Sequence, residues 1–84
     1  MKVLIAEDSS MHAMILEKIC EQVLGAEKVV ATNEDDAFIL FKNMKFDLVL
    51  TDMQMKSKFG GQILCGQIKE ISDCPVVLIK GIDE

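Results

Sequence analysis

Residues 46–52 read Phe46-Asp47-Leu48-Val49-Leu50-Thr51-Asp52, a largely apolar run that ends on a carboxylate. A short run of this kind is typical of a strand buried on both faces, as in a parallel sheet that helices cover. Asp52 is then expected at the carboxyl end of the strand. Because ligands of open α/β sheets bind beyond that edge, the run predicts a central strand and the position of a binding site.

A second apolar run, residues 2–6, also leads directly into acid, at Glu7 and Asp8. If the two strands are parallel neighbours, the carboxylates of Glu7, Asp8 and Asp52 meet at one edge of the sheet. Carboxylates this close resist full ionisation unless a cation neutralises them. A lone strand-end Asp is usually only solvated, but three acids at two adjacent strand ends indicate an acidic pocket that binds a cation.

Length and composition favour one small globular domain. The chain has 84 residues, of which half are hydrophobic and 27% are charged. All nine basic residues are lysines, and 14 acidic residues leave a net charge of −5, so we expect no nucleic-acid partner and no anionic membrane surface. The apolar run at the N-terminus is too short for a signal peptide, and nothing approaches the length of a membrane span.

The cysteines and the one histidine do not suggest a catalytic or metal site. Cys20, Cys65 and Cys74 are odd in number and form no C-x-x-C pair. Neither a disulfide framework nor a zinc site is indicated, and buried thiols in a reducing cytoplasm are the simplest interpretation. His12 is expected to be a surface residue of a helix rather than part of a catalytic triad.

Residues 9–25 have the pattern of one amphipathic helix. Ser9 or Ser10 can cap its first turn, and Gly25 is a natural stop. Apolar residues recur every four positions along it, which predicts the face that packs on the sheet. These residues are Met11, Ile15, Ile19 and Val23, with Met14 and Leu16 flanking them.

The rest of the chain alternates strand and helix. Residues 28–32 predict a strand, and Asn33 can cap the helix after it. The acidic run 34–36 falls in the first helical turn, where the helix dipole favours negative charge, so we interpret it as a helix start and not a metal cluster. A loop over residues 53–61 closes on two glycines, another helix follows, and residues 74–80 form a fourth strand. This β-α-β-α-β-α-β order predicts a doubly wound parallel α/β sheet.

Two segments carry a resemblance to a known family. Residues 2–8, followed by Ser9 and Ser10, and residues 46–55 resemble the receiver domain of two-component response regulators, and the likeness extends over nearly the whole chain. It implies a flavodoxin-like fold with four strands in the order 2-1-3-4. It also implies that the protein is not an enzyme but a cytoplasmic signalling domain, which acts through contacts with a downstream protein target.

The resemblance assigns roles to the acidic residues. Asp52 matches the aspartate that accepts a phosphoryl group from a sensor histidine kinase or a phosphotransfer protein. Glu7 and Asp8 match the acids that bind Mg²⁺. Magnesium prefers one or two carboxylates with waters and other oxygens, so Asp8, Asp52 and the backbone carbonyl of Gln54 are its expected ligands, with Glu7 acting through water.

The sequence departs from the family at several places. Lys56 and the pair Phe59-Gly60 stand where receivers usually have Pro and Asp-Gly. Lys80 stands at the place of a Ser or Thr that contacts the phosphoryl group. Its ammonium group is a candidate partner of the phosphate or of Asp52. The family continues through a fifth strand and a last helix, so residues 1–84 are expected to be a truncated receiver-like domain, either a natural short form or a fragment.

The departures keep a second function open. A pseudo-receiver, which is not phosphorylated and acts as an interaction or dimerisation module, would also retain this fold. A magnesium-dependent phosphohydrolase has no supporting residue beyond the same three acids. The fourth strand is expected to be an uncovered apolar edge, so a homodimer contact is predicted through Val76, Val77, Leu78 and Ile79.

Overall fold

Four strands and three α-helices alternate along the chain, as the sequence predicts. The computed structural model describes residues 1–55 and 57–80. The elements are β1 (Lys2–Ala6), α1 (Ser10–Ile19), the π-helical turn η1 (Cys20–Leu24), β2 (Glu27–Ala31), α2 (Glu34–Asn43), β3 (Leu48–Asp52), α3 (Gly60–Ile71) and β4 (Val76–Ile79). No helix of the described part is both long and apolar enough to cross a membrane.

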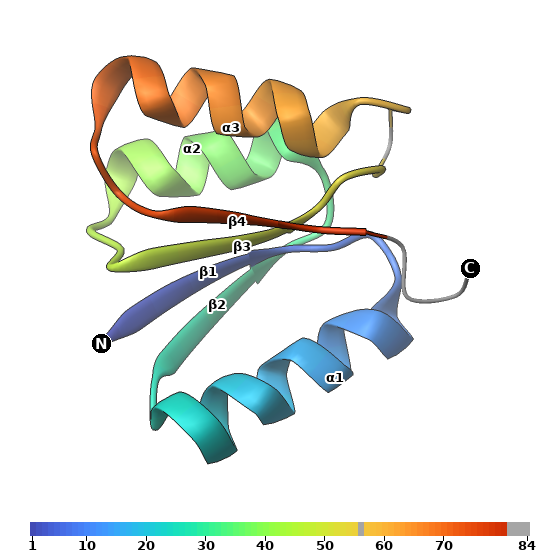
Figure 1. Cartoon of the computed structure of the whole chain (residues 1–84), viewed down its shortest axis with the longest axis vertical. Helices are drawn as coiled ribbons and strands as arrows, with labels where there is room; N and C mark the ends of the chain where they lie inside the picture. The colour runs from blue at the N-terminus through green and yellow to red at the C-terminus, as the bar shows by residue number, and fades with distance from the viewer. Residues whose placement is uncertain (56, 81–84) are drawn as a thin grey trace.

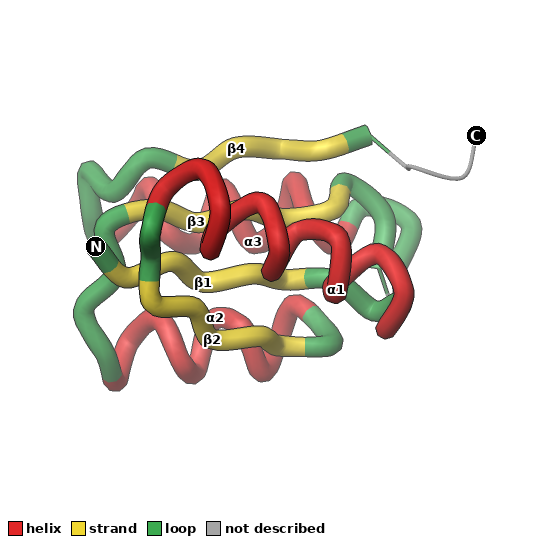
Figure 2. The backbone as a smooth tube through the Cα atoms, turned by 90° about the horizontal axis from the view of Figure 1, so that it is seen from below, coloured by secondary structure: helices red, strands yellow, loops and turns green. Residues whose placement is uncertain are grey.

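The strands form one parallel sheet in the order β2-β1-β3-β4, which confirms the predicted flavodoxin-like topology. Helices α2 and α3 lie side by side on one face of the sheet, and α1 lies on the other (Figure 1). Figure 2, seen from the side of α1, shows the four strands running between these two helix layers. Since all strands run the same way, their carboxyl ends share one edge.

Each face of the sheet has its own hydrophobic core. The core under α2 and α3 is built on Leu4, Ala6, Ala31, Ala37, Phe41, Val49, Met55, Leu64 and Ile68. The core under α1 is smaller and contains Val3, Ile5, Leu16, Cys20 and Ala26. Burial on both faces explains why β1 and β3 are almost continuously apolar.

The predicted buried face of α1 was wrong. Met11, Ile15, Ile19 and Val23 are exposed. The buried residues are instead Ala13 and Leu16 of α1 and Cys20 of η1, of which Leu16 was predicted to flank the apolar repeat. The first turn of α1 is capped by Ser9, whose side chain accepts the backbone N–H of His12. An apolar repeat identifies a helix, but it cannot decide which of two apolar stripes faces the sheet.

Other element boundaries differ by a few residues from those predicted. The first helix ends in η1, and Gly25 follows it with a φ of 58°, a left-handed conformation that glycine adopts without strain. Asn33 caps α2 as expected, by accepting the N–H of Asp36. Gly60 and Gly61 do not close a loop but form the first turn of α3.

Candidate acidic site at the strand edge

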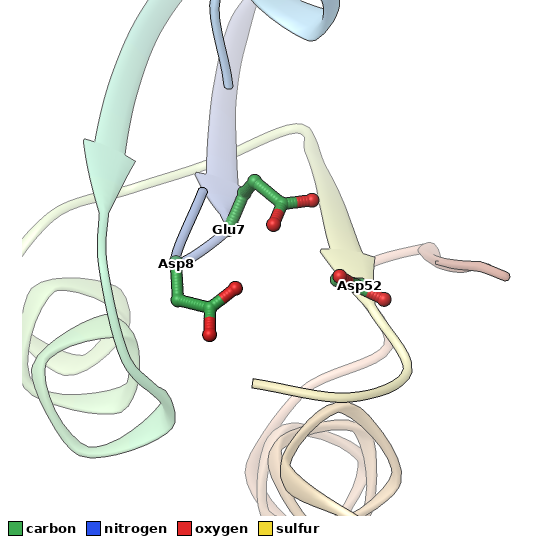
Figure 3. A group of neighbouring side chains, drawn as sticks. All are labelled: Glu7, Asp8 and Asp52. Carbon is green, nitrogen blue, oxygen red and sulfur yellow. The ribbon is translucent and has the colours of Figure 1, made fainter. Parts of the chain in front are cut away.

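Three carboxylates meet where two neighbouring strands end. Glu7 and Asp8 directly follow β1, and Asp52 is the last residue of β3. β1 and β3 are hydrogen-bonded neighbours, with Ala6 opposite Thr51. One carboxylate oxygen from each acid lies within 4.8 Å of the other two. Figure 3 shows the three side chains around one gap at this edge. The acids therefore gather as the sequence predicts.

The loops after the strands hold two of these acids in place. Glu7 and Asp52 are buried, with 2% and 8% of their surface exposed, whereas Asp8 is exposed. The backbone N–H of Ser9 donates to Oε2 of Glu7 over 3.1 Å. The backbone N–H of Gln54 donates to Oδ1 of Asp52 over 3.2 Å. Each buried carboxylate is thus oriented by the chain two residues beyond it, while Asp8 keeps access to solvent.

The site carries more negative charge than its surroundings neutralise. Burial raises the pKa of Glu7 to about 7, and the neighbouring charges of Asp52 and Asp8 add to this, against the lowering effect of the Ser9 N–H. The one ion pair among residues 1–55 and 57–80 joins Glu21 to Lys28, which lie away from the cluster. A cation at the gap would relieve the repulsion between the acids.

The donor set fits magnesium. Every ligand atom in the cluster is a carboxylate oxygen, and hard divalent cations such as Mg²⁺ prefer oxygen ligands. No histidine or cysteine belongs to this group, so softer metals such as zinc are less well matched. Among residues 1–55 and 57–80, Glu7, Asp8 and Asp52 form the acidic group whose oxygens suit a hard divalent ion.

The other residues singled out from the sequence lie around this cluster or away from it. Lys80 is exposed and comes directly after Ile79, which is paired with Asp52 in the sheet. Gln54 is exposed beside Asp52. His12 is half-buried in the first turn of α1 and is not part of the acidic group. Lys56 lies outside the described residues.

Two residues near the site were not foreseen. Gly61 packs directly on the backbone that follows β3, because its N–H donates to the carbonyl of Met53 over 3.0 Å. Glu34 lies in the first turn of α2, as predicted, but its side chain is buried. Its place three residues before Ala37 and seven before Phe41 puts Glu34 on the buried stripe of α2, whereas Asp35 and Asp36 are exposed.

Comparison with known proteins agrees with this arrangement. The chain matches the family described as "Response regulator receiver domain" over residues 3–84. It is 29% identical over 83 residues to the probable transcriptional regulator ycf27 of Porphyra purpurea, and 30% identical over 83 residues to that of Guillardia theta. These matches cover 99% of this chain but 33% and 32% of the relatives, so the chain spans about a third of their length.

Solved receiver structures are similar to this chain. The receiver domain of the Francisella response regulator 1452 is 25% identical with a TM-score of 0.81, and the match covers 99% of this chain and 68% of that one. A response regulator receiver domain protein from Clostridium thermocellum is 26% identical with a TM-score of 0.84, over 96% of this chain and 65% of that one. PhyR of Bartonella quintana, crystallised in complex with the anti-sigma factor NepR, is 29% identical with a TM-score of 0.82. The match covers 89% of this chain and 31% of that one.

Proposed function

Since the chain belongs to the response regulator receiver domain family, we propose that it is a phosphorelay receiver whose Asp52 accepts a phosphoryl group from a phosphohistidine. The donor would be a sensor histidine kinase or a phosphotransfer protein. The observation that carries the proposal is the meeting of three carboxylates at the ends of β1 and β3. A fold alone would not suffice, because doubly wound sheets host many unrelated functions.

The chemistry follows from the geometry of Asp52. One carboxylate oxygen of Asp52 attacks the phosphorus atom, the P–N bond of the phosphohistidine breaks, and the imidazole leaves with the electron pair and takes up a proton. The Gln54 N–H, bonded to Oδ1, orients the carboxylate for this attack. Bound magnesium would offset the negative charge of the acids and of the phosphoryl oxygens. Asp8, Asp52 and the Gln54 carbonyl would hold it directly, and Glu7 through water.

Exposure to a small phosphodonor tests this proposal. With acetyl phosphate and magnesium, the protein is expected to gain the mass of one phosphoryl group, because Asp52 is the buried acceptor at the strand edge. Asp52→Asn is expected to gain none. Asp73→Asn, which removes an exposed acid outside the cluster, should behave like the wild type. Intact mass spectrometry distinguishes these results, and an unmodified wild-type protein would instead favour the pseudo-receiver.

The pseudo-receiver is the alternative function, and one departure at the site favours it. Lys80 stands at the end of β4 where receivers have a hydroxyl residue, so the usual contact with the phosphoryl group is missing. We propose that Lys80 can supply a positive charge there, either to the phosphoryl group or to Asp52. Lys80→Ala is then expected to strengthen magnesium binding at Asp8 and Asp52, because a competing cation is removed. Unchanged magnesium affinity in a titration would rule out this role.

Signalling would proceed through protein contacts, and we propose a homodimer through β4 as one of them. β4 is an edge strand, and 46% of Val77 and 38% of Leu78 are exposed. Val77 pairs with Leu50 and so lies on the face of α1, where Met14, Ile15 and Ile19 are also exposed. Exposed apolar side chains on an edge strand are typical of an association site. The complex of PhyR with NepR supports a protein target in addition.

Charge placed on the edge strand tests the dimer. We expect the wild type to sediment as a dimer at concentrations on the order of tens of micromolar, and Val77→Asp as a monomer, because association would bury an unpaired charge. Ile39→Asp is the matched control, since Ile39 is equally exposed but lies on α2. A well-folded wild-type monomer would contradict the dimer and leave the phosphoacceptor proposal untouched.

The remaining proposals concern the setting of the domain. We propose that residues 1–84 act as one receiver-like unit, a signalling domain rather than an enzyme, in the reducing cytoplasm. The free thiols of Cys20, Cys65 and Cys74 are consistent with such a compartment. Neither nucleic acid nor a membrane is proposed as a partner, because the net charge is −5.

A further inference from the structure

Helix α3 begins without a side-chain cap. Phe59 occupies the cap position, its side chain accepts no hydrogen bond, and the first turn contains no acidic residue. The N–H groups of Gly60 and Gly61 donate instead to the carbonyls of Ser57 and Met53. Both carbonyls belong to the loop that follows Asp52. The start of α3 is therefore built on the same loop that supports the acidic site.

Glu34 is a buried acid with an unsatisfied oxygen. It is the first residue of α2, and 7% of its surface is exposed. Its Oε2 is the one buried side-chain oxygen or nitrogen without a hydrogen-bond partner in the described part of the chain. Asn33 already caps α2, so Glu34 is not needed there as a cap. Burying a polar group without a hydrogen bond is unfavourable, and some other interaction has to compensate.

The carboxylate of Glu34 lies against the first residue of α3. A Cβ atom at position 60 would be 2.0 Å from Oε2 of Glu34 and 3.0 Å from its Cδ. Glu34 thus occupies the space in which any side chain at position 60 would begin, and Gly60 is the residue that permits this. Because α2 and α3 run side by side (Figure 1), one carboxylate lies at the N-termini of two helices. Each N-terminus carries the positive end of a helix dipole, which favours an anion.

We propose that Glu34 is a positioning residue for the acidic site. It makes no hydrogen bond to α3, but its charge stabilises the positive end of the α3 dipole in place of the side-chain cap that Phe59 lacks, and glycine at position 60 leaves room for it. By holding the first turn of α3 it holds Met53 and Ser57, whose carbonyls accept from that turn, and with them the segment 53–55 in which the Gln54 N–H orients Asp52. Met55 joins the contact, since it is buried and its Cβ would lie 3.4 Å from a Cβ at position 60. The positioning role rests on the proposed phosphoacceptor function.

A double-mutant cycle tests the contact between Glu34 and Gly60. We expect Gly60→Ala to lower the melting temperature of the wild type by about 2 to 4 °C, because the new methyl group displaces the carboxylate of Glu34 from the first turn of α3. In a Glu34→Ala background the same change should lower it by less than half as much, since the obstructing side chain has gone. Glu34→Gln preserves the shape of the side chain and does not relieve the contact, so it tests the charge alone and does so even if Glu34→Ala does not fold. In that background Gly60→Ala keeps its steric effect, and Glu34→Gln itself should lower the melting temperature by about 5 °C.

A charge-matched control separates the effect of Glu34 on α3 from a general effect of charge. Asp35→Asn makes the same change of charge in the same turn, but Asp35 is exposed. We expect it to shift the melting temperature by no more than about 2 °C. Amide exchange at Gly61 should be about tenfold faster in Glu34→Gln than in Asp35→Asn, because the first turn of α3 opens more often. Equal shifts of Gly60→Ala with and without the Glu34 side chain, or equal exchange in the two amide variants, would overturn the proposal.

The rate of phosphorylation tests whether Glu34 affects the chemistry at Asp52. Phosphorylation by acetyl phosphate should be about tenfold slower in Glu34→Gln than in Asp35→Asn, at a temperature at which both are folded. Equal rates would overturn the positioning role. The melting and exchange measurements need neither magnesium nor a phosphodonor, so they decide whether Glu34 stabilises the first turn of α3 even if wild-type Asp52 takes up no phosphoryl group. That last result would count against the proposed function alone.

Discussion

Replacing Gly61 by alanine is expected to destabilise the domain by on the order of 3 kcal/mol and to disrupt the acidic site. A Cβ atom at position 61 would lie 2.0 Å from the carbonyl oxygen of Asp52 and 2.7 Å from Cα of Met53. Both atoms belong to the backbone, so no side chain can rotate away. Either the start of α3 or the end of β3 has to move, and Asp52 moves with it.

The same helix provides the control for this prediction. Gly66 lies in the interior of α3, and a Cβ atom there would meet nothing within 4 Å. Gly66→Ala should therefore stabilise the protein by about 0.5 to 1 kcal/mol, through the higher helix propensity of alanine. Urea denaturation measures both changes, and magnesium titration reports on the site. If Gly61→Ala were as stable as Gly66→Ala, the close approach of α3 to Asp52 would be wrong.

Stability in metal-free buffer is expected to fall as the pH rises from about 4.5 to about 7, because of Glu7. The pKa of this carboxyl group is raised from 4.5 to about 7 in the folded protein, chiefly by burial. The folded state therefore binds the proton more tightly than the unfolded chain. The stabilisation of the folded state by protonated Glu7 is fully present below pH 4.5 and is lost as the pH rises through about 7. It amounts to on the order of 2 kcal/mol of unfolding free energy.

The charged groups around Glu7 determine how this prediction is tested. Asp8 and Asp52 face it and disfavour its ionised form, and the Ser9 N–H favours it. Glu7→Gln should remove most of the decline in stability between the two pH values, because glutamine does not titrate. Millimolar magnesium should raise the melting temperature of the wild type at pH 8, above the pKa of Glu7, and Asp52→Asn should reduce that rise. Thermal unfolding in chelator and in magnesium at several pH values measures both effects. A wild type whose stability is flat over this range would show that Glu7 titrates normally.

The sequence by itself determined the order of the elements and the place of the acidic site. Strands β1 and β3 are apolar runs that end directly on acids, and the segments between strands have helical spacing, so both features are readable from neighbouring residues. Parallel strands present their carboxyl ends at one edge, which brings Glu7, Asp8 and Asp52 together without further information. The apolar runs, the helical spacing and the acids at the strand ends are patterns of neighbouring residues. They can be read without knowing how the elements pack.

Only the tertiary structure decided which surfaces meet. Leu16 of α1 and Cys20 of η1 pack on the sheet, although Ile15 and Ile19 repeat just as regularly. Glu34 is buried because Gly60, which is remote in sequence, leaves room for its carboxylate. Gly61 lies on the backbone of Asp52 for a similar reason. Close approach between distant segments depends on the shapes of the surfaces that pack together. The periodicity of one segment does not predict the shape of the segment that packs on it.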